Sequence, residues 1–121
     1  MTASQIVLGT PIATDVIEDT SANSTAQNNV TGAAAVFFGI LIDNTANSAA
    51  SYVKIYNHAS PTVGTTAPDF VFACPASVSR QYTMAGGVAL GTAISYACTT
   101  AGGTAGAVSP SSAVVIRILV T

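Results

Sequence analysis

The chain has 121 residues, a length typical of one domain. Only eight side chains carry a formal charge, which is 7% of the chain against about 25% in average soluble domains, and the mean hydropathy is +0.55. Three cations cannot form the basic stripe of a nucleic-acid-binding protein, and no apolar run approaches the roughly 20 residues of a membrane-spanning helix. We therefore expect a subunit whose surface is largely covered by other proteins, with neither nucleic acid nor membrane as a partner.

The first quarter of the chain, residues 1–32, is polar and rich in Thr, Ser, Ala and Asn. Residues 12–17 could form one short strand, whereas residues 18–31 have no apolar periodicity. We interpret residues 1–32 as an extended N-terminal arm that lies on a neighbouring subunit. The start of the chain has neither the basic residues nor the sustained apolar stretch of a signal peptide, so we expect no export.

Residues 33–121 are predicted to form the folded β-domain, beginning with the longest apolar run, Ala33–Ile42. Strict alternation predicts that this strand is apolar on both faces, so it needs a second sheet or a neighbouring subunit to cover it. Residues 44–51 are then a loop, and residues 52–56 are a second, antiparallel strand. In this prediction, Val36, Phe38, Ile40 and Ile42 share one face, and Phe37, Gly39 and Leu41 share the other.

Two features of this region admit more than one interpretation. Tyr52, Lys54 and Tyr56 share one face of their strand, where the tyrosines either shield the aliphatic part of Lys54 or form a contact surface. Asp43 begins a turn that is rich in Asn and Ser. It lacks the carboxylates and the glycine of a calcium loop, so we expect turn capping and no metal.

The chain then continues as short strands separated by loops. Residues 57–68 are a loop carrying His58, which has no catalytic partner nearby in the sequence. Strands are expected at 69–75, with Phe70, Phe72 and Cys74 on one face, and at 78–84. The latter carries Arg80 and Tyr82 on its apolar face. Arg80 could extend to solvent, pair with an acid or bind an anion.

The last third is predicted as two strands and two glycine-containing connections. Residues 85–87 are interpreted as a hairpin-type turn, residues 88–98 as one strand and residues 99–112 as a low-complexity loop without a nucleotide-binding pattern. The closing strand, residues 113–120, alternates. One row contains Val114, Ile116, Ile118 and Val120, and the other contains Val115, Arg117 and Leu119.

Cys74 and Cys98 lack a Cys-x-x-Cys spacing and have no histidine close by, so we expect no zinc site. Two interpretations remain open. The cysteines either form a disulfide with each other or act as two small, buried apolar side chains. A pair of carboxylates suited to hydrolysis is also missing, since only Asp43 and Asp69 lie near the ends of separate strands. We therefore predict no enzymatic activity, no cofactor and no small-molecule substrate.

Six or seven strands without a helical period predict an all-β fold, namely an antiparallel β-sandwich of jelly-roll type. Three stretches also resemble small structural proteins of tailed bacteriophages: DNTANSAASYVKIYN from Asp43, SPTVGTTAPDFVFACPAS from Ser60 and GGVALGTAISYACTTAGGTAG from Gly86. The resemblance covers residues 43–117, about two-thirds of the chain.

The resemblance is greatest to capsid decoration, or cement, proteins. It implies a homotrimer on the capsid surface of the virion that binds the major capsid protein after synthesis in the bacterial cytoplasm. Tail, collar or fibre proteins, including receptor-binding domains, are the alternative. If residues 1–32 serve only for attachment, their deletion should leave a folded trimer. Candidate contact residues are Phe37, Leu41, Tyr52, Tyr56, Arg80 and Tyr82.

Overall fold

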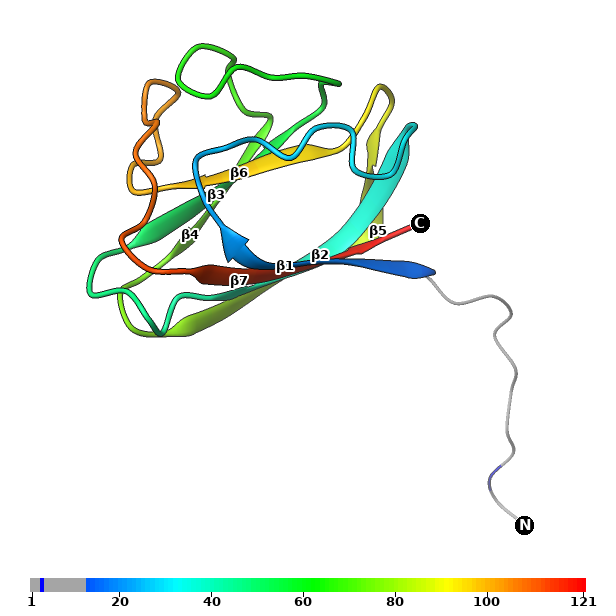
Figure 1. Cartoon of the computed structure of the whole chain (residues 1–121). Helices are drawn as coiled ribbons and strands as arrows, with labels where there is room; N and C mark the ends of the chain where they lie inside the picture. The colour runs from blue at the N-terminus through cyan, green and yellow to red at the C-terminus, as the bar shows by residue number, and fades with distance from the viewer. Residues whose placement is uncertain (1–2, 4–12) are drawn as a thin grey trace.

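The structure is a computed structural model that describes Ala3 and residues 13–121. Every regular element in this part of the chain is a strand, so the all-β prediction is confirmed (Figure 1). The elements are β1 (Asp15–Ala22), β2 (Ala35–Asp43), β3 (Ser51–Tyr56), β4 (Phe70–Cys74), β5 (Ser79–Leu90), β6 (Ser95–Thr99) and β7 (Val114–Val120).

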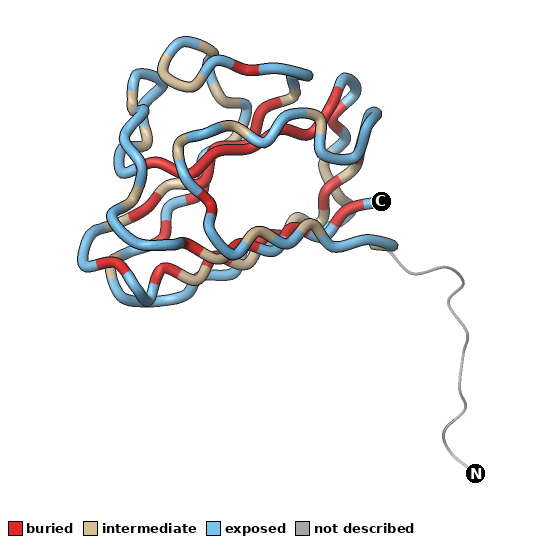
Figure 2. Tube along the Cα trace, in the orientation of Figure 1, coloured by how far each residue is buried: buried red, intermediate tan, exposed pale blue. Residues whose placement is uncertain are grey.

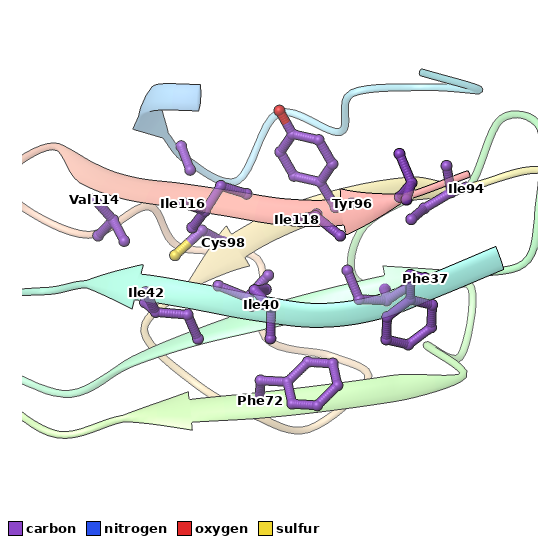
Figure 3. Close-up of a cluster of buried hydrophobic side chains, with 14 of the residues drawn as sticks. Phe37, Ile40, Ile42, Phe72, Ile94, Tyr96, Cys98, Val114, Ile116 and Ile118 are labelled. Atoms are coloured by element: carbon purple, nitrogen blue, oxygen red, sulfur yellow. The ribbon is translucent and has the colours of Figure 1, made fainter. Parts of the chain in front are cut away.

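The strands form two antiparallel sheets that share one core. The four-stranded sheet has the order β1-β7-β2-β5, and the three-stranded sheet has the order β4-β3-β6. Figure 3 shows side chains of β2 and β7 facing Phe72 of β4 and Cys98 of β6. Three aromatic rings connect the two sheets. The ring centroid of Phe37 in β2 lies 5.5 Å from that of Phe70 and 6.2 Å from that of Phe72, and both contacts are edge-on.

Regular alternation gave correct predictions where strands are straight. In β7, the row containing Val114 and Ile116 is fully buried, whereas Arg117 and Leu119 face solvent. In β4, Phe72 and Cys74 face the core, and Val71 and Ala73 face outward. Period-two burial follows from the pleat as long as no residue is inserted.

The predicted faces of β2 are correct as far as Phe38 and wrong after it, because β2 contains a β-bulge. Phe37 pairs with Val120 of β7, while Gly39 pairs with the preceding residue, Leu119, so Phe38 is the extra residue. Phe37 and Ile40 therefore both face the core, and Leu41 faces outward with Phe38. The bulge changes the side of the sheet on which each later residue lies.

The expected turn at residues 85–87 is wrong as well. β5 continues through it, and Met84–Gly87 together lie opposite the bulge at Phe38, with Gly86 and Gly87 at φ of +80° and +78°. The strand expected at residues 88–98 is instead divided. β5 ends at Leu90 in one sheet, and β6 begins at Ser95 in the other.

Most of the predicted N-terminal arm belongs to the folded domain. β1 begins at Asp15 and pairs with β7, whereas the expected strand was 12–17, of which Ile12 lies outside the described residues. The next residues run beside β6: Gln27 exchanges backbone hydrogen bonds with Tyr96 at 2.8 and 3.1 Å, and Val30 N donates to Ile94 O at 2.9 Å. Figure 1 shows this blue segment crossing from one sheet to the other. The remainder of the arm, apart from Ala3, lies outside the described residues.

The turn after β2 is held by capping hydrogen bonds of the expected kind. Asp43 Oδ1 accepts hydrogen bonds from Thr45 N at 3.0 Å and from Thr45 Oγ1 at 2.6 Å. The fully buried Asn44 donates to Ala49 O and Pro75 O, both at 3.0 Å, and accepts a hydrogen bond from Ser51 Oγ at 2.8 Å. These hydrogen bonds hold together the corner at which the chain passes from β2 in one sheet to β3 in the other.

Candidate interaction surface

The outward side of the four-stranded sheet is largely apolar, and we call it the outer face. Val16 of β1 is 54% exposed and Leu119 of β7 is 41% exposed, even though both are large aliphatic side chains. Phe38 and Leu41 of β2, the strand next to β7, are half-buried on the same face. Figure 2 shows exposed and buried residues alternating along these strands, so the sheet has one side in the core and one in solvent.

A hollow of about 320 Å³ lies on the outer face, lined by side chains from all four strands of that sheet. Gly39 forms part of its floor. A Cβ at this position would stand 3.1 Å from Tyr82 O and 3.9 Å from Leu119 Cδ1, so glycine allows β2 to lie close to β5 here. The lining residues are Val16, Phe38, Gly39, Ile40, Leu41, Gln81, Thr83, Arg117 and Leu119.

A second hollow of about 300 Å³ continues the first toward the start of the described chain. The two hollows share Phe38, Thr83 and Leu119, so they form one groove, and the second reaches Ala13. Because apolar side chains dominate the lining and no cluster of polar groups converges there, the groove suits an apolar polypeptide segment better than a polar ligand.

One ion pair lies at the margin of the groove. Arg117 Nε of β7 donates to Glu18 Oε2 of β1 at 2.9 Å, and the two side chains are about half exposed. Exposed pairs of this kind contribute little to stability. Arg117 also lines the first hollow, so the pair places polar groups beside the apolar side chains there.

The opposite side of the molecule differs, because the 99–112 loop covers the outward side of the three-stranded sheet. Lys54 of β3 is fully buried beneath this loop, and its Nζ donates to Gly103 O and Gly106 O, each at 2.7 Å. Burial lowers the pKa of Lys54 and raises the pKa of the neighbouring Tyr56. A Cβ on Gly102 would touch the ring of Tyr52 at 3.0 Å, so this loop packs closely on β3.

The six contact residues proposed from the sequence do not gather on one surface. Phe37 and Tyr56 are fully buried within the chain and have no exposed surface to offer a partner. Leu41 lines the groove, whereas Tyr52 lies under the loop on the other sheet. Arg80 is exposed on the edge strand β5. Tyr82, also on β5, has a half-buried ring whose centroid lies 5.2 Å from that of Phe72, and its hydroxyl group donates a hydrogen bond to Ala73 O.

The sequence analysis did not propose Val16, Phe38 and Leu119 as contact residues. For Leu119 a signal existed, since alternation placed it on the same face of its strand as Arg117. Phe38 was assigned to the face containing Ile40 because no sequence pattern revealed the bulge. Val16 lies in a segment whose pairing with β7 could not be foreseen from its weak apolar pattern.

The single histidine, His58, has a structural partner. His58 Nδ1 accepts a hydrogen bond from Ser60 N at 2.9 Å within its own loop. Among Ala3 and residues 13–121, no three His, Cys, Asp or Glu side chains lie close enough together to hold a metal ion. Within the same residues, no helix could cross a membrane.

Both cysteines are reduced and buried. β3 lies between them, because Cys74 of β4 pairs with Ser51 and Cys98 of β6 pairs with Val53. Two strand spacings amount to about 9.5 Å. This exceeds the roughly 7 Å limit between the Cα atoms of a disulfide. The structure therefore favours the two-thiol interpretation over the disulfide.

These features define an all-β protein with two antiparallel sheets, one of which presents an apolar outer face. No protein-family model, curated protein or solved structure matches this chain.

Proposed function

We propose that the chain is a jelly roll in which residues 23–30 serve as an eighth, irregular strand. In a jelly roll, one long antiparallel hairpin of strands is rolled up, so the first strand pairs with the last, the second with the seventh, and so on inward. Four pairings support this assignment: β1 with β7, residues 23–30 with β6, β2 with β5, and β3 with β4. Jelly rolls are frequent in viral capsid proteins and lectins.

We further propose that the protein is a structural subunit of a tailed-bacteriophage particle, a capsid decoration protein that acts by contact without catalysis. The observation that carries this proposal is the apolar outer face on a chain with only eight charged side chains. Exposed apolar patches larger than a few hundred Å² are rare on soluble monomers. The exposure of Val16 and Leu119 beside an apolar groove supports a partner for this face. The resemblance of residues 43–117 to phage structural proteins supports the choice of a virion.

The proposed mechanism depends on buried area. Copies of the protein form a homotrimer and bind the major capsid protein on the outside of the shell, which holds neighbouring capsid subunits together. Each Å² of apolar surface removed from water stabilises the contact by about 25 cal/mol. Association costs about 4–15 kcal/mol per binding event, so the contacts must be extensive and repeated over the lattice.

Electron microscopy of intact particles that contain this protein would test the proposal. A decoration protein is expected at hundreds of copies on the capsid lattice, with its density on the outside of the shell. A few copies at the tail, collar or fibres would contradict the decoration role and favour the alternative, a tail or receptor-binding subunit. Absence of the protein from purified particles would contradict both virion roles.

Solution measurements test the contact surface separately. Analytical ultracentrifugation should detect a trimer in the full-length protein. Leu119→Ser should weaken association, because this substitution makes the outer face more polar at an exposed position. The matched control is Val71→Ser, since Val71 is 40% exposed but lies on the outward side of the three-stranded sheet. Equal effects of the two substitutions would contradict the assignment of the contact to the outer face.

A further inference from the structure

We propose that the apolar groove on the outer face binds residues 5–8 of a second copy of this chain, so that N-terminal segments are exchanged between subunits. This inference rests on the proposed assembly function and names the partner of the same surface. Its first support is the position of Ala13, which lines the second hollow together with Phe38 and Leu119. The preceding twelve residues therefore join the domain at the end of the groove.

The composition of the N-terminal segment matches the groove. Residues 1–12 carry no charged side chain, and they contain one consecutive aliphatic run, Ile6-Val7-Leu8. The groove is lined mainly by apolar side chains, with Gln81, Thr83 and Arg117 as polar lining residues. Binding the run there would remove apolar surface from water on both sides, and it would leave the Arg117–Glu18 pair at the rim.

The length of the N-terminal segment and the direction in which the chain enters β1 favour binding to the groove of a second copy over binding to the groove of the same chain. Twelve extended residues reach about 40 Å, which is more than the span of a single strand. Pro11 favours extended backbone at Thr10, and Thr14 N donates to Val120 O at 3.0 Å, so the chain enters β1 already aligned with the edge of the sheet. Because Thr14 continues the line of β1 along the sheet edge, we infer that the segment before it extends to a neighbouring subunit.

Site-directed crosslinking between full-length chains tests the exchange. One variant carries Val7→Cys, and a second carries Gln81→Cys, whose position lines the groove and is exposed. The native Cys74 and Cys98 are buried and should not react. When the two variants are mixed and treated with a short bismaleimide, a covalent heterodimer is expected. A mixture of Val7→Cys with Val71→Cys, on the outward side of the other sheet, is the matched control and should give no heterodimer.

Three results would overturn the proposal: no crosslink in the mixture, equal crosslinking to the Val71→Cys control, or crosslinking only within a chain that carries both Val7→Cys and Gln81→Cys. The oligomeric state separates this failure from failure of the assembly function. A full-length protein that remains oligomeric without the crosslink overturns only the segment exchange. A full-length protein that stays monomeric at every concentration overturns both proposals.

A second full-chain experiment measures the contribution of the segment. Leu8→Ser removes one aliphatic side chain from the proposed contact, and it should raise the concentration at which the oligomer dissociates about tenfold or more. Thr2→Ser, in the same segment but outside the aliphatic run, is the control and should leave this concentration unchanged. An unchanged dissociation concentration in Leu8→Ser would contradict the proposed contact.

Discussion

At the scale of single residues, Lys54 is the most unusual side chain in the described part of the protein. It is fully buried, and its ammonium group contacts two backbone carbonyl oxygens. Removing a cation from water is costly unless hydrogen bonds replace the lost hydration. The two carbonyls belong to the 99–112 loop, so Lys54 fastens this loop to β3. Sequence alternation placed Lys54 between two tyrosines but gave no sign of the covering loop.

Lys54→Met should destabilise the protein at neutral pH by about 2 kcal/mol, because Gly103 O and Gly106 O lose their donor. The size of the difference should depend on pH. Burial lowers the pKa of Lys54 from its ordinary value of about 10.4, so below that value the unfolded chain binds more protons than the folded one. The free energy of unfolding of the wild type relative to Lys54→Met should therefore rise as the pH increases toward 10.

Urea denaturation of both proteins between pH 7 and 10 measures this difference, and Arg80→Met serves as a control at an exposed cation. The control should show no pH-dependent change relative to the wild type. A difference between wild type and Lys54→Met that shrinks as the pH rises would contradict the assigned direction of the pKa shift.

Gly87 is the second residue whose chemical identity the fold requires. Its φ is +78°, and a Cβ there would stand 2.5 Å from Cε1 of Phe38 and 2.6 Å from Cγ1 of Val36. Gly87→Ala should therefore lower stability by more than about 1 kcal/mol, through both backbone strain and the clash with the bulged Phe38.

Gly91→Ala is the matched control for this prediction, because the added Cβ would meet nothing within 4 Å and the residue has no positive φ. Thermal denaturation of the two variants gives the comparison. A Gly87→Ala protein as stable as the control would show that β5 accommodates the side chain by shifting away from β2.

At the scale of elements, β1 and the segment after it determine how far the chain can be shortened. β1 is an edge strand of the four-stranded sheet, and residues 23–30 hydrogen-bond to β6 of the other sheet. Ala22, at the end of β1, is itself buried in the core. Residues 15–30 therefore contribute to both sheets, so we expect that a chain without residues 1–32 does not fold, in contrast to the expectation of a folded trimer.

Deletion of residues 1–32 should abolish the cooperative unfolding transition, because it exposes the β7 edge, the β6 edge and part of the core. Deletion of residues 1–12 should leave the transition in place, since all seven strands of the described part of the chain lie after this segment. Circular dichroism during heating distinguishes the two proteins. A cooperative transition in the longer deletion would contradict the structural role of β1.

At the scale of the whole molecule, the two sheets enclose both cysteines in one core. Cys74 and Cys98 are fully buried, and burial raises the pKa of Cys98 to about 12 and also raises that of Cys74. The thiolate is the reactive form of cysteine, so both groups should be inert in the native protein.

Labelling with iodoacetamide at pH 8 should accordingly modify no cysteine in the folded protein and two after denaturation. Prolonged exposure to oxidised glutathione should leave both thiols free, because β3 separates them. Mass spectrometry counts the labels. Rapid labelling of the native protein, or an intramolecular disulfide, would mean that the core opens readily or that β4 and β6 lie closer than the structure places them.

The sequence alone determined the fold class and several strand faces. Turn residues and regular alternation of residue types identified β3, β4 and β7. In β4 and β7 the pleat of a straight strand also imposes a period of two on burial. The small number of charged side chains also indicated that part of the surface would be apolar, and the exposed Val16 and Leu119 are examples. These properties are local, so a single sequence carries them.

Tertiary structure decided where the pairing partners lie and therefore which residues reach the outer face. The bulge at Phe38 interrupts the pairing of β2 with both β5 and β7, and the part of β5 that contains Gly86 and Gly87 lies opposite it. The inclusion of residues 23–30 depends on β6, nearly 70 residues later in the chain. Such pairings are set by hydrogen bonds between distant segments, and no local pattern of amino acids encodes them.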